Sequence, residues 1–121
     1  MGMALEFRRI QSKKFDFSLM YESAQENQGT EVPVRIYLKQ NNGSEEYVGY
    51  SDIVMVQYQL DASFRSRSVA SKDSSNMFEV RIWAHGSFEI TVNVLLKAGR
   101  TESIRGYIDL TKSMGEIRIA K

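Results

Sequence analysis

The chain has 121 residues, 42% of them hydrophobic and 26% charged, which is the composition of one ordinary globular domain with a single core. Sixteen basic and fifteen acidic residues give a formal net charge of +1, so the protein has no overall field that would attract nucleic acid or an anionic membrane. The absence of cysteine excludes disulfides, cysteine nucleophiles and thiolate metal sites.

Hydrophobic residues recur with a period of two along most of the chain, which is typical of strands with one buried face. A short helix is an option only for residues 4–12, ALEFRRIQS. The stretch 65–76, RSRSVASKDSSN, has the composition of a loop, and we expect it to be solvated and flexible. The alternative is that Arg65, Arg67 and Lys72 form a rim that contacts an anionic group such as phosphate or an acidic peptide. Strands are predicted, in chain order, at residues 14–21, 32–39, 53–60, 77–83, 88–96, 103–110 and 115–121.

Each predicted strand divides its side chains between two faces. The even-numbered residues of 32–38 and of 54–60 are hydrophobic or aromatic, and we expect both sets to face inward. Tyr47, Tyr50 and Trp83 are predicted to point outward. They form either a partner surface, where exposed aromatic residues are enriched, or cross-strand pairs on a solvent-facing sheet.

About seven to eight short antiparallel strands predict an all-β fold, an immunoglobulin-like β-sandwich. We expect one domain over residues 1–121, because neither a linker nor a repeat interrupts the pattern. No hydrophobic run approaches the roughly 20 residues of a membrane helix, and the amino end lacks the hydrophobic region of a secretory signal. The expectation is therefore a cytoplasmic protein that does not enter a membrane.

Two stretches of the chain resemble the paired motifs of YEATS domains, most closely those of the prokaryotic branch. The first is YQLDASF at residues 58–64, which a basic loop follows, and the second is FEVRIWAHGSFEI at residues 78–90. The flanking strands extend the resemblance to roughly residues 30–112. It implies a recognition module without catalytic activity or a cofactor. Family members that read histones hold an acylated lysine between two aromatic rings, one from each loop.

The resemblance also implies positions for the binding residues. By position, Ser63 supplies the first-loop hydroxyl, Phe64 the first ring and Phe88 the floor of the pocket. The sequence departs from the family pattern at Asp61, where a histidine is usual, and at His85, where tryptophan or tyrosine is usual. These departures keep a cationic or hydrogen-bonding ligand open as an alternative to an acyl group. The predicted ligand-binding residues are Asp61, Ser63, Phe64, Ala84, His85, Gly86 and Phe88.

Two functions remain open at this point. The first is a reader of a modified peptide at an end pocket, in a bacterial signalling or defence system. The second is a structural adaptor that binds a partner protein through a sheet edge or face. Asp61, Ser63 and His85 are residue types of a hydrolytic triad, but no nucleophile elbow accompanies them, so we expect no enzyme. A single histidine supplies too few ligands for zinc, so no metal is expected.

Overall fold

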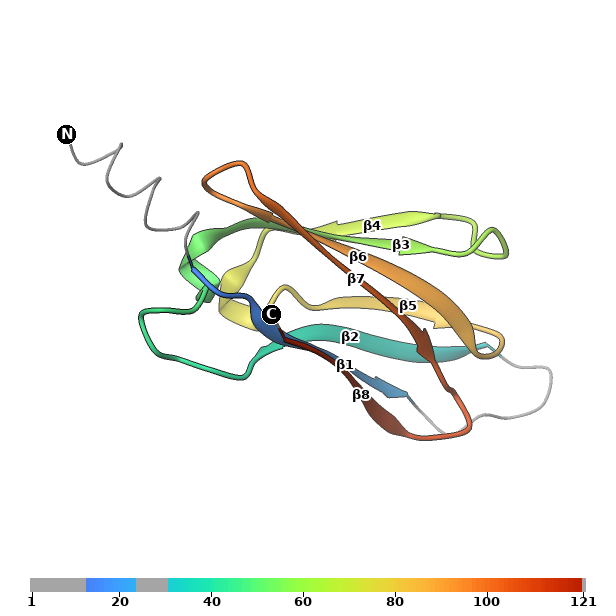
Figure 1. Ribbon diagram of the computed structural model, residues 1–121. Coiled ribbons are helices and arrows are strands. Elements are labelled where there is room, and N and C mark those ends of the chain that lie inside the picture. Colours follow the sequence, from blue (N-terminus) through green and yellow to red (C-terminus); the bar gives the residue numbers. More distant parts are fainter. Residues whose placement is uncertain (1–12, 24–30, 121) are drawn as a thin grey trace.

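The computed structural model describes residues 13–23 and 31–120, so the helix considered for residues 4–12 lies outside the described residues. Eight strands form two antiparallel four-stranded sheets (Figure 1), with the orders β5-β2-β1-β8 and β4-β3-β6-β7. The elements are β1 (Asp16–Ser23), β2 (Val32–Gln40), η1 (Tyr50–Asp52), β3 (Ile53–Leu60), β4 (Ser68–Ser71), η2 (Ser74–Asn76), β5 (Val80–Ala84), β6 (Phe88–Leu96), β7 (Thr101–Ile108) and β8 (Met114–Ala120).

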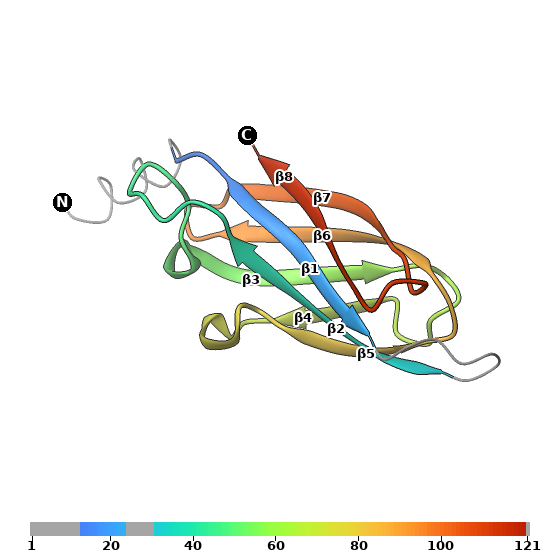
Figure 2. The same cartoon turned by 90° about the horizontal axis from the view of Figure 1, so that it is seen from below.

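The two sheets pack face to face and bury the hydrophobic face of each strand. In β2 the four residues predicted to face inward are all buried, and every second residue of β6 is buried in the same way. β4 and β5 lie side by side along one side of the sandwich, and β7 and β8 along the other (Figure 2). The predicted all-β, immunoglobulin-like sandwich is confirmed.

The prediction of a flexible loop over residues 65–76 is wrong in its middle. This stretch contains the four-residue strand β4 and the short helix η2. β4 pairs with β3, with Val69 opposite Tyr58, and Val69 packs against the hydrophobic core. The sequence gives only a weak indication of β4, because Val69 alone packs against the core and the other residues of this edge strand are small or polar. The amino-acid composition of the stretch is therefore that of a loop.

Two predicted side-chain orientations are also wrong. Val54 was expected to face inward but is 46% exposed. The pairing of β3 with β6 shifts register between Ile53 and Met55, and such an irregularity turns a side chain to the other face. Tyr50 was expected to point outward, yet its ring packs on Phe17 with the centroids 5.4 Å apart, and its hydroxyl donates a hydrogen bond to the Leu38 carbonyl.

The entry to β5 is held in an unusual backbone conformation. Met77 and Phe78 both have left-handed φ angles, 61° and 56°, which non-glycine residues rarely adopt. The Phe78 side chain is fully buried, and its carbonyl accepts a hydrogen bond of 2.6 Å from the Tyr58 hydroxyl. Burial raises the pKa of Tyr58, so this hydroxyl stays protonated as the donor. The buried hydrogen bond between Tyr58 and Phe78 therefore connects the segment before β5 to β3 in the opposite sheet.

We expect Tyr58→Phe to destabilise the fold by about 1–2 kcal/mol, because it leaves the buried Phe78 carbonyl without its partner. The free energy of unfolding from urea titration measures this loss. Tyr107→Phe is the matched control, since Tyr107 is 56% exposed and its variant should differ by less than about 0.5 kcal/mol. Equal stabilities of the two variants would contradict the role given to the Tyr58 hydroxyl.

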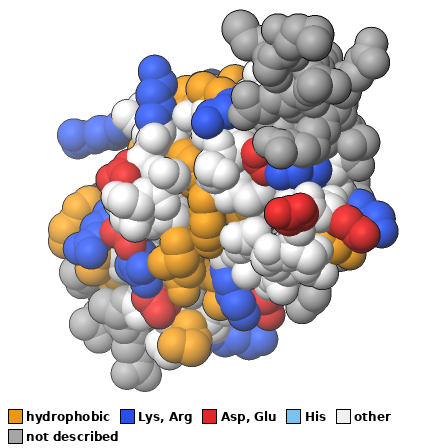
Figure 3. Space-filling model, turned by 90° about the vertical axis from the view of Figure 1, so that its left-hand side faces the viewer, with side chains coloured by type: hydrophobic (Ala, Val, Ile, Leu, Met, Phe, Trp, Pro, Cys, Tyr) orange, Lys and Arg blue, Asp and Glu red, His pale blue; other side chains and the backbone are white. Residues whose placement is uncertain are grey.

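Among the described residues, the end of the sandwich that carries the β2–β3 connection and the β6–β7 turn has charges of both signs. Figure 3 views this end and shows a band of hydrophobic side chains with basic and acidic side chains on either side. None of the helices in the described part of the chain has the length and hydrophobicity needed to cross a bilayer.

Candidate functional site

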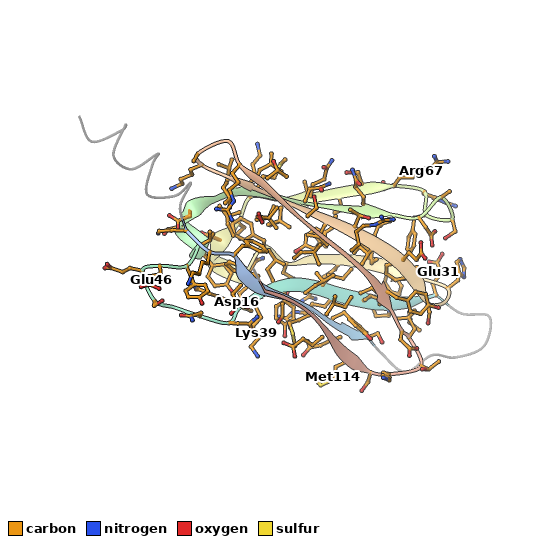
Figure 4. The ribbon with its side chains drawn as sticks, in the orientation of Figure 1. Asp16, Glu31, Lys39, Glu46, Arg67 and Met114 are labelled. Atoms are coloured by element: carbon orange, nitrogen blue, oxygen red, sulfur yellow. The ribbon has the colours of Figure 1, made fainter. Side chains whose placement is uncertain are left out.

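A cavity of about 700 Å³ opens at the other end of the sandwich, between the β3–β4 loop, the β5–β6 loop and the adjoining edges of β4 and β5. Glu31 and Arg67 mark this end in Figure 4. The cavity is lined by Glu31, Leu60, Ser63, Phe64, Arg65, Ser66, Val69, Arg81, Ile82, Trp83, His85, Gly86, Ser87 and Phe88. A volume of this size is within the range of small-molecule sites in proteins.

Asp61 organises the β3–β4 loop. Its Oδ1 accepts hydrogen bonds from the backbone N–H of Ser63, at 2.9 Å, and from the Ser63 hydroxyl, which is the pattern of an Asx turn. The Phe64 N–H donates to the Asp61 carbonyl at 3.2 Å, so the turn also fixes the next residue. The Ser63 hydroxyl therefore donates its proton to Asp61 and keeps its capacity to accept a hydrogen bond, and Ser63 lines the cavity.

The same contacts lower the pKa of Asp61. The hydrogen bond from the Ser63 hydroxyl is the largest cause, followed by that from the Ser63 backbone N–H. Both hydrogen bonds favour the ionised carboxylate. Their contribution to stability is fully present above the ordinary pKa of 3.8 and is lost as the pH falls through the lowered pKa of Asp61 in the folded protein.

We therefore expect the β3–β4 loop to keep one geometry over the neutral and mildly acidic range and to change only below about pH 4. The Ser63 amide chemical shift, followed by NMR during an acid titration, measures this change. Asp61→Ala should remove the transition and give the low-pH shift throughout. A Ser63 transition centred near neutral pH would contradict the assignment to Asp61.

Phe64 and Phe88 form the aromatic wall of the cavity. Their ring centroids lie 4.9 Å apart with an interplanar angle of 70°, an edge-to-face contact. Phe88 is 3% exposed and belongs to the core, whereas Phe64 is half-buried and packs against the core from the loop. Edge-to-face pairs of this kind add roughly 0.5–1.5 kcal/mol beyond area burial. The pair therefore fixes the exposed part of the Phe64 ring at the cavity wall.

The β5–β6 loop carries the only histidine of the chain. His85 is largely exposed, and its Nε2 lies 2.9 Å from Glu31 Oε1. The next residue, Gly86, has no heavy atom near the position a Cβ would take. Ser87 accepts a hydrogen bond of 2.8 Å from the Leu110 N–H, which ties the loop to the segment after β7. His85 therefore belongs to the rim of the cavity and not to the core.

The structure brings five of the seven predicted site residues to the cavity lining, namely Ser63, Phe64, His85, Gly86 and Phe88. The other two lie beside it. Asp61 acts on the cavity through Ser63, and Ala84 is 1% exposed with its side chain in the core. The ligand-binding role of all seven residues stays a prediction.

Sequence reasoning did not include several residues that line the cavity. Trp83 was expected to point away from the core, and it does so at 62% exposure, but it also borders the cavity. Glu31 carries no sequence signal, because it is far along the chain from both loops, and Val69 lies in the stretch 65–76, whose composition is that of a loop. Arg65 and Arg81 add basic groups, and Arg81 Nε donates to Glu79 Oε2 at 3.1 Å.

The described side chains do not assemble a hydrolytic triad. Ser63 donates its hydroxyl proton to Asp61, and His85 contacts Glu31 instead of either residue. A nucleophilic serine needs its hydroxyl against a base that a third group orients. Within residues 13–23 and 31–120, no group of three or more potential ligands could hold a metal ion.

A family model described as the prokaryotic YEATS domain matches residues 32–109 of this chain. The matched range contains both loops of the cavity and six of the eight strands in full, β2 to β7. This chain belongs to the prokaryotic YEATS domain family. The resemblance seen in the two loop motifs is thereby confirmed. A search of curated proteins found no match.

Solved YEATS domains share the fold at low sequence identity. The Yaf9 YEATS domain recognizing an H3K122suc peptide superimposes with a TM-score of 0.64 at 12% identity, over 89% of this chain and 83% of that one. The Yaf9 YEATS domain bound to H3K27ac gives 0.62 at 9% identity, over 89% and 87%. The yeast AF-9 homolog protein Yaf9 gives 0.60 at 11% identity, over 88% and 77%.

Proposed function

We propose that this YEATS domain is a recognition module that binds an acylated lysine of a partner peptide in the cavity between the β3–β4 and β5–β6 loops. The observation that carries the proposal is the Ser63 hydroxyl, held by Asp61 beside the Phe64 ring at the cavity wall. Membership of the family and the Yaf9 YEATS domain structures with an H3K122suc peptide and with H3K27ac support a modified lysine as the ligand.

The hydrogen bonding of Ser63 fits an amide. Its proton is donated to Asp61, so its oxygen acts as an acceptor toward the cavity. The amide N–H of an acylated lysine can donate to this oxygen. The acyl carbonyl needs a donor of its own, which backbone N–H groups of the β5–β6 loop can supply. The open space around Gly86 lets a ligand approach that backbone closely.

The aromatic wall fits a flat and uncharged group. Phe64 presents its ring to the cavity and is backed by Phe88, and His85 lies on the rim with a ring that also stacks on an amide plane. Because a neutral acyl amide loses less hydration than an ammonium group on entering such a site, the wall favours acylated over unmodified lysine. The separate pairing of Ser63 and His85 supports binding without catalysis. The setting that we propose is a bacterial signalling or defence system, and the prokaryotic family supports its bacterial part.

The test is an NMR titration of the ¹⁵N-labelled protein with two capped peptides that differ only in Nε-acetylation of a central lysine. We expect the acetylated peptide to shift the amides of Ser63, Phe64, His85 and Gly86, and the unmodified peptide to bind at least about tenfold more weakly. Equal binding of both peptides would contradict the proposal. Shifts confined to residues far from both loops would favour the adaptor function instead.

A further inference from the structure

The cavity runs along the open edge of β5. Arg81, Ile82 and Trp83 are consecutive residues of this strand, and all three line the cavity. Ile82 is buried and faces the core, whereas Arg81 and Trp83 point to the outer face, where they are exposed. Since neighbouring side chains of a strand lie on opposite faces, one cavity can touch all three only at the strand edge. β5 is a terminal strand of its sheet, with β2 as its partner.

The backbone groups that point to this open edge can be assigned. Leu38 of β2 donates its N–H to the Met77 carbonyl, on the β5 side, and Asn41 donates to the Asp16 carbonyl, on the β1 side. Even-numbered residues of β2 therefore bond toward β5, because hydrogen-bonding directions alternate along a strand. Arg81 and Trp83 lie opposite the odd-numbered residues Arg35 and Pro33, so their N–H and C=O groups point outward, beside the cavity.

We propose that the partner peptide binds as an added strand along the open edge of β5, with its acylated lysine opposite Ile82. This inference rests on the proposed function. A residue opposite Ile82 points to the same face as Ile82, which is the face that borders the cavity between the two sheets. The added strand is antiparallel to β5, so the two neighbours of the lysine lie opposite Arg81 and Trp83 and exchange hydrogen bonds with the free backbone groups of these residues. Backbone pairing supplies affinity and the side chains supply selectivity in this mode of recognition.

The outer face indicates which residues flank the lysine. Arg81 lies directly opposite Arg35 in the sheet, and Glu79 contacts both guanidinium groups. A carboxylate on the added strand would lie beside Arg81 on the side of β5 that has no partner strand. It would form an opposite-charge pair with Arg81, and such cross-strand pairs are favourable. Trp83 lies beside Pro33 and offers an exposed indole to a hydrophobic residue. The expected peptide has an acidic residue on one side of the acylated lysine and a hydrophobic residue on the other.

The test uses a capped heptapeptide in which leucine precedes and aspartate follows the central Nε-acetyl-lysine, because an antiparallel strand then places aspartate opposite Arg81 and leucine opposite Trp83. The comparison peptides are the heptapeptide with the reverse order and capped Nε-acetyl-lysine alone. We expect the first heptapeptide to bind at least about tenfold more tightly than the single residue. N-methylation of its two flanking residues should remove this gain, whereas N-methylation at the acetyl-lysine itself should not, because that N–H points away from β5. Amide exchange at Arg81 and Trp83 should slow on binding, and exchange at Ile82 should not change.

Three results would overturn the inference, and they are distinguishable. If heptapeptide and single residue both bind at Phe64 and His85 with equal affinity, the pocket is real but the edge is not used. If neither shifts these resonances, the proposed function fails and the added strand with it. If Arg81 and Trp83 are already protected in the free protein, and more so at higher protein concentration, a second copy of the chain occupies the edge.

Discussion

Phe64→Ala will weaken binding of an acetyl-lysine peptide on the order of 30-fold, which corresponds to about 2 kcal/mol. The variant removes the exposed ring at the cavity wall together with its contact to Phe88 at 4.9 Å. Both the contact area of the ring and its stacking on the amide plane are lost, and aromatic residues in such positions dominate binding energy. Fluorescence anisotropy of a labelled peptide measures the dissociation constant.

Loss of binding by Phe64→Ala has to be separated from loss of folding, because Phe64 also packs against the core. Phe64→Leu is the second variant. It retains most of the hydrophobic volume, so it should keep nearly normal stability and still lose affinity. Tyr107→Leu replaces an exposed aromatic residue that does not line the cavity, and its affinity should equal that of the parent protein. Normal binding by Phe64→Leu would show that the ring itself is not used.

Gly115→Ala should destabilise the fold by about 2–3 kcal/mol, as overpacking against a buried side chain does. Gly115 lies directly opposite Tyr21 in the pairing of β1 with β8. A Cβ at this position would stand 2.2 Å from the Tyr21 hydroxyl oxygen and 2.3 Å from the ring carbon that carries it. Tyr21 is 4% exposed and its hydroxyl accepts a hydrogen bond from the Asp109 N–H, so its ring has little freedom to move.

The matched control is Gly43→Ala, because no atom lies within 4 Å of the Cβ position at Gly43. This variant should differ from the parent protein by less than about 0.5 kcal/mol. Urea unfolding followed by circular dichroism compares the two variants under the same conditions. Equal stabilities of Gly115→Ala and Gly43→Ala would show that the Tyr21 ring can move away from an added Cβ, and would contradict the expected loss of stability.

Much of the site was accessible from sequence because its signals are local. Ser63, Phe64, His85 and Phe88 were assigned from two short motifs, and the structure places all four at one cavity. Glu31 was not accessible in this way. It reaches the cavity through its contact with His85, more than fifty positions along the chain, and no local pattern encodes such a distant contact.

The alternation of hydrophobic and polar residues by itself determined the strands other than β4, most of their buried faces and the outward position of Trp83, because side-chain direction in a regular strand depends only on neighbouring residues. The tertiary structure alone decided which strands became edges. It placed β4 inside an apparent loop and left one side of β5 without a partner strand. The order and register of strands depend on pairing between segments that are distant in the sequence. The cavity exists only because the edges of β4 and β5 and the β3–β4 and β5–β6 loops meet at one end of the sandwich.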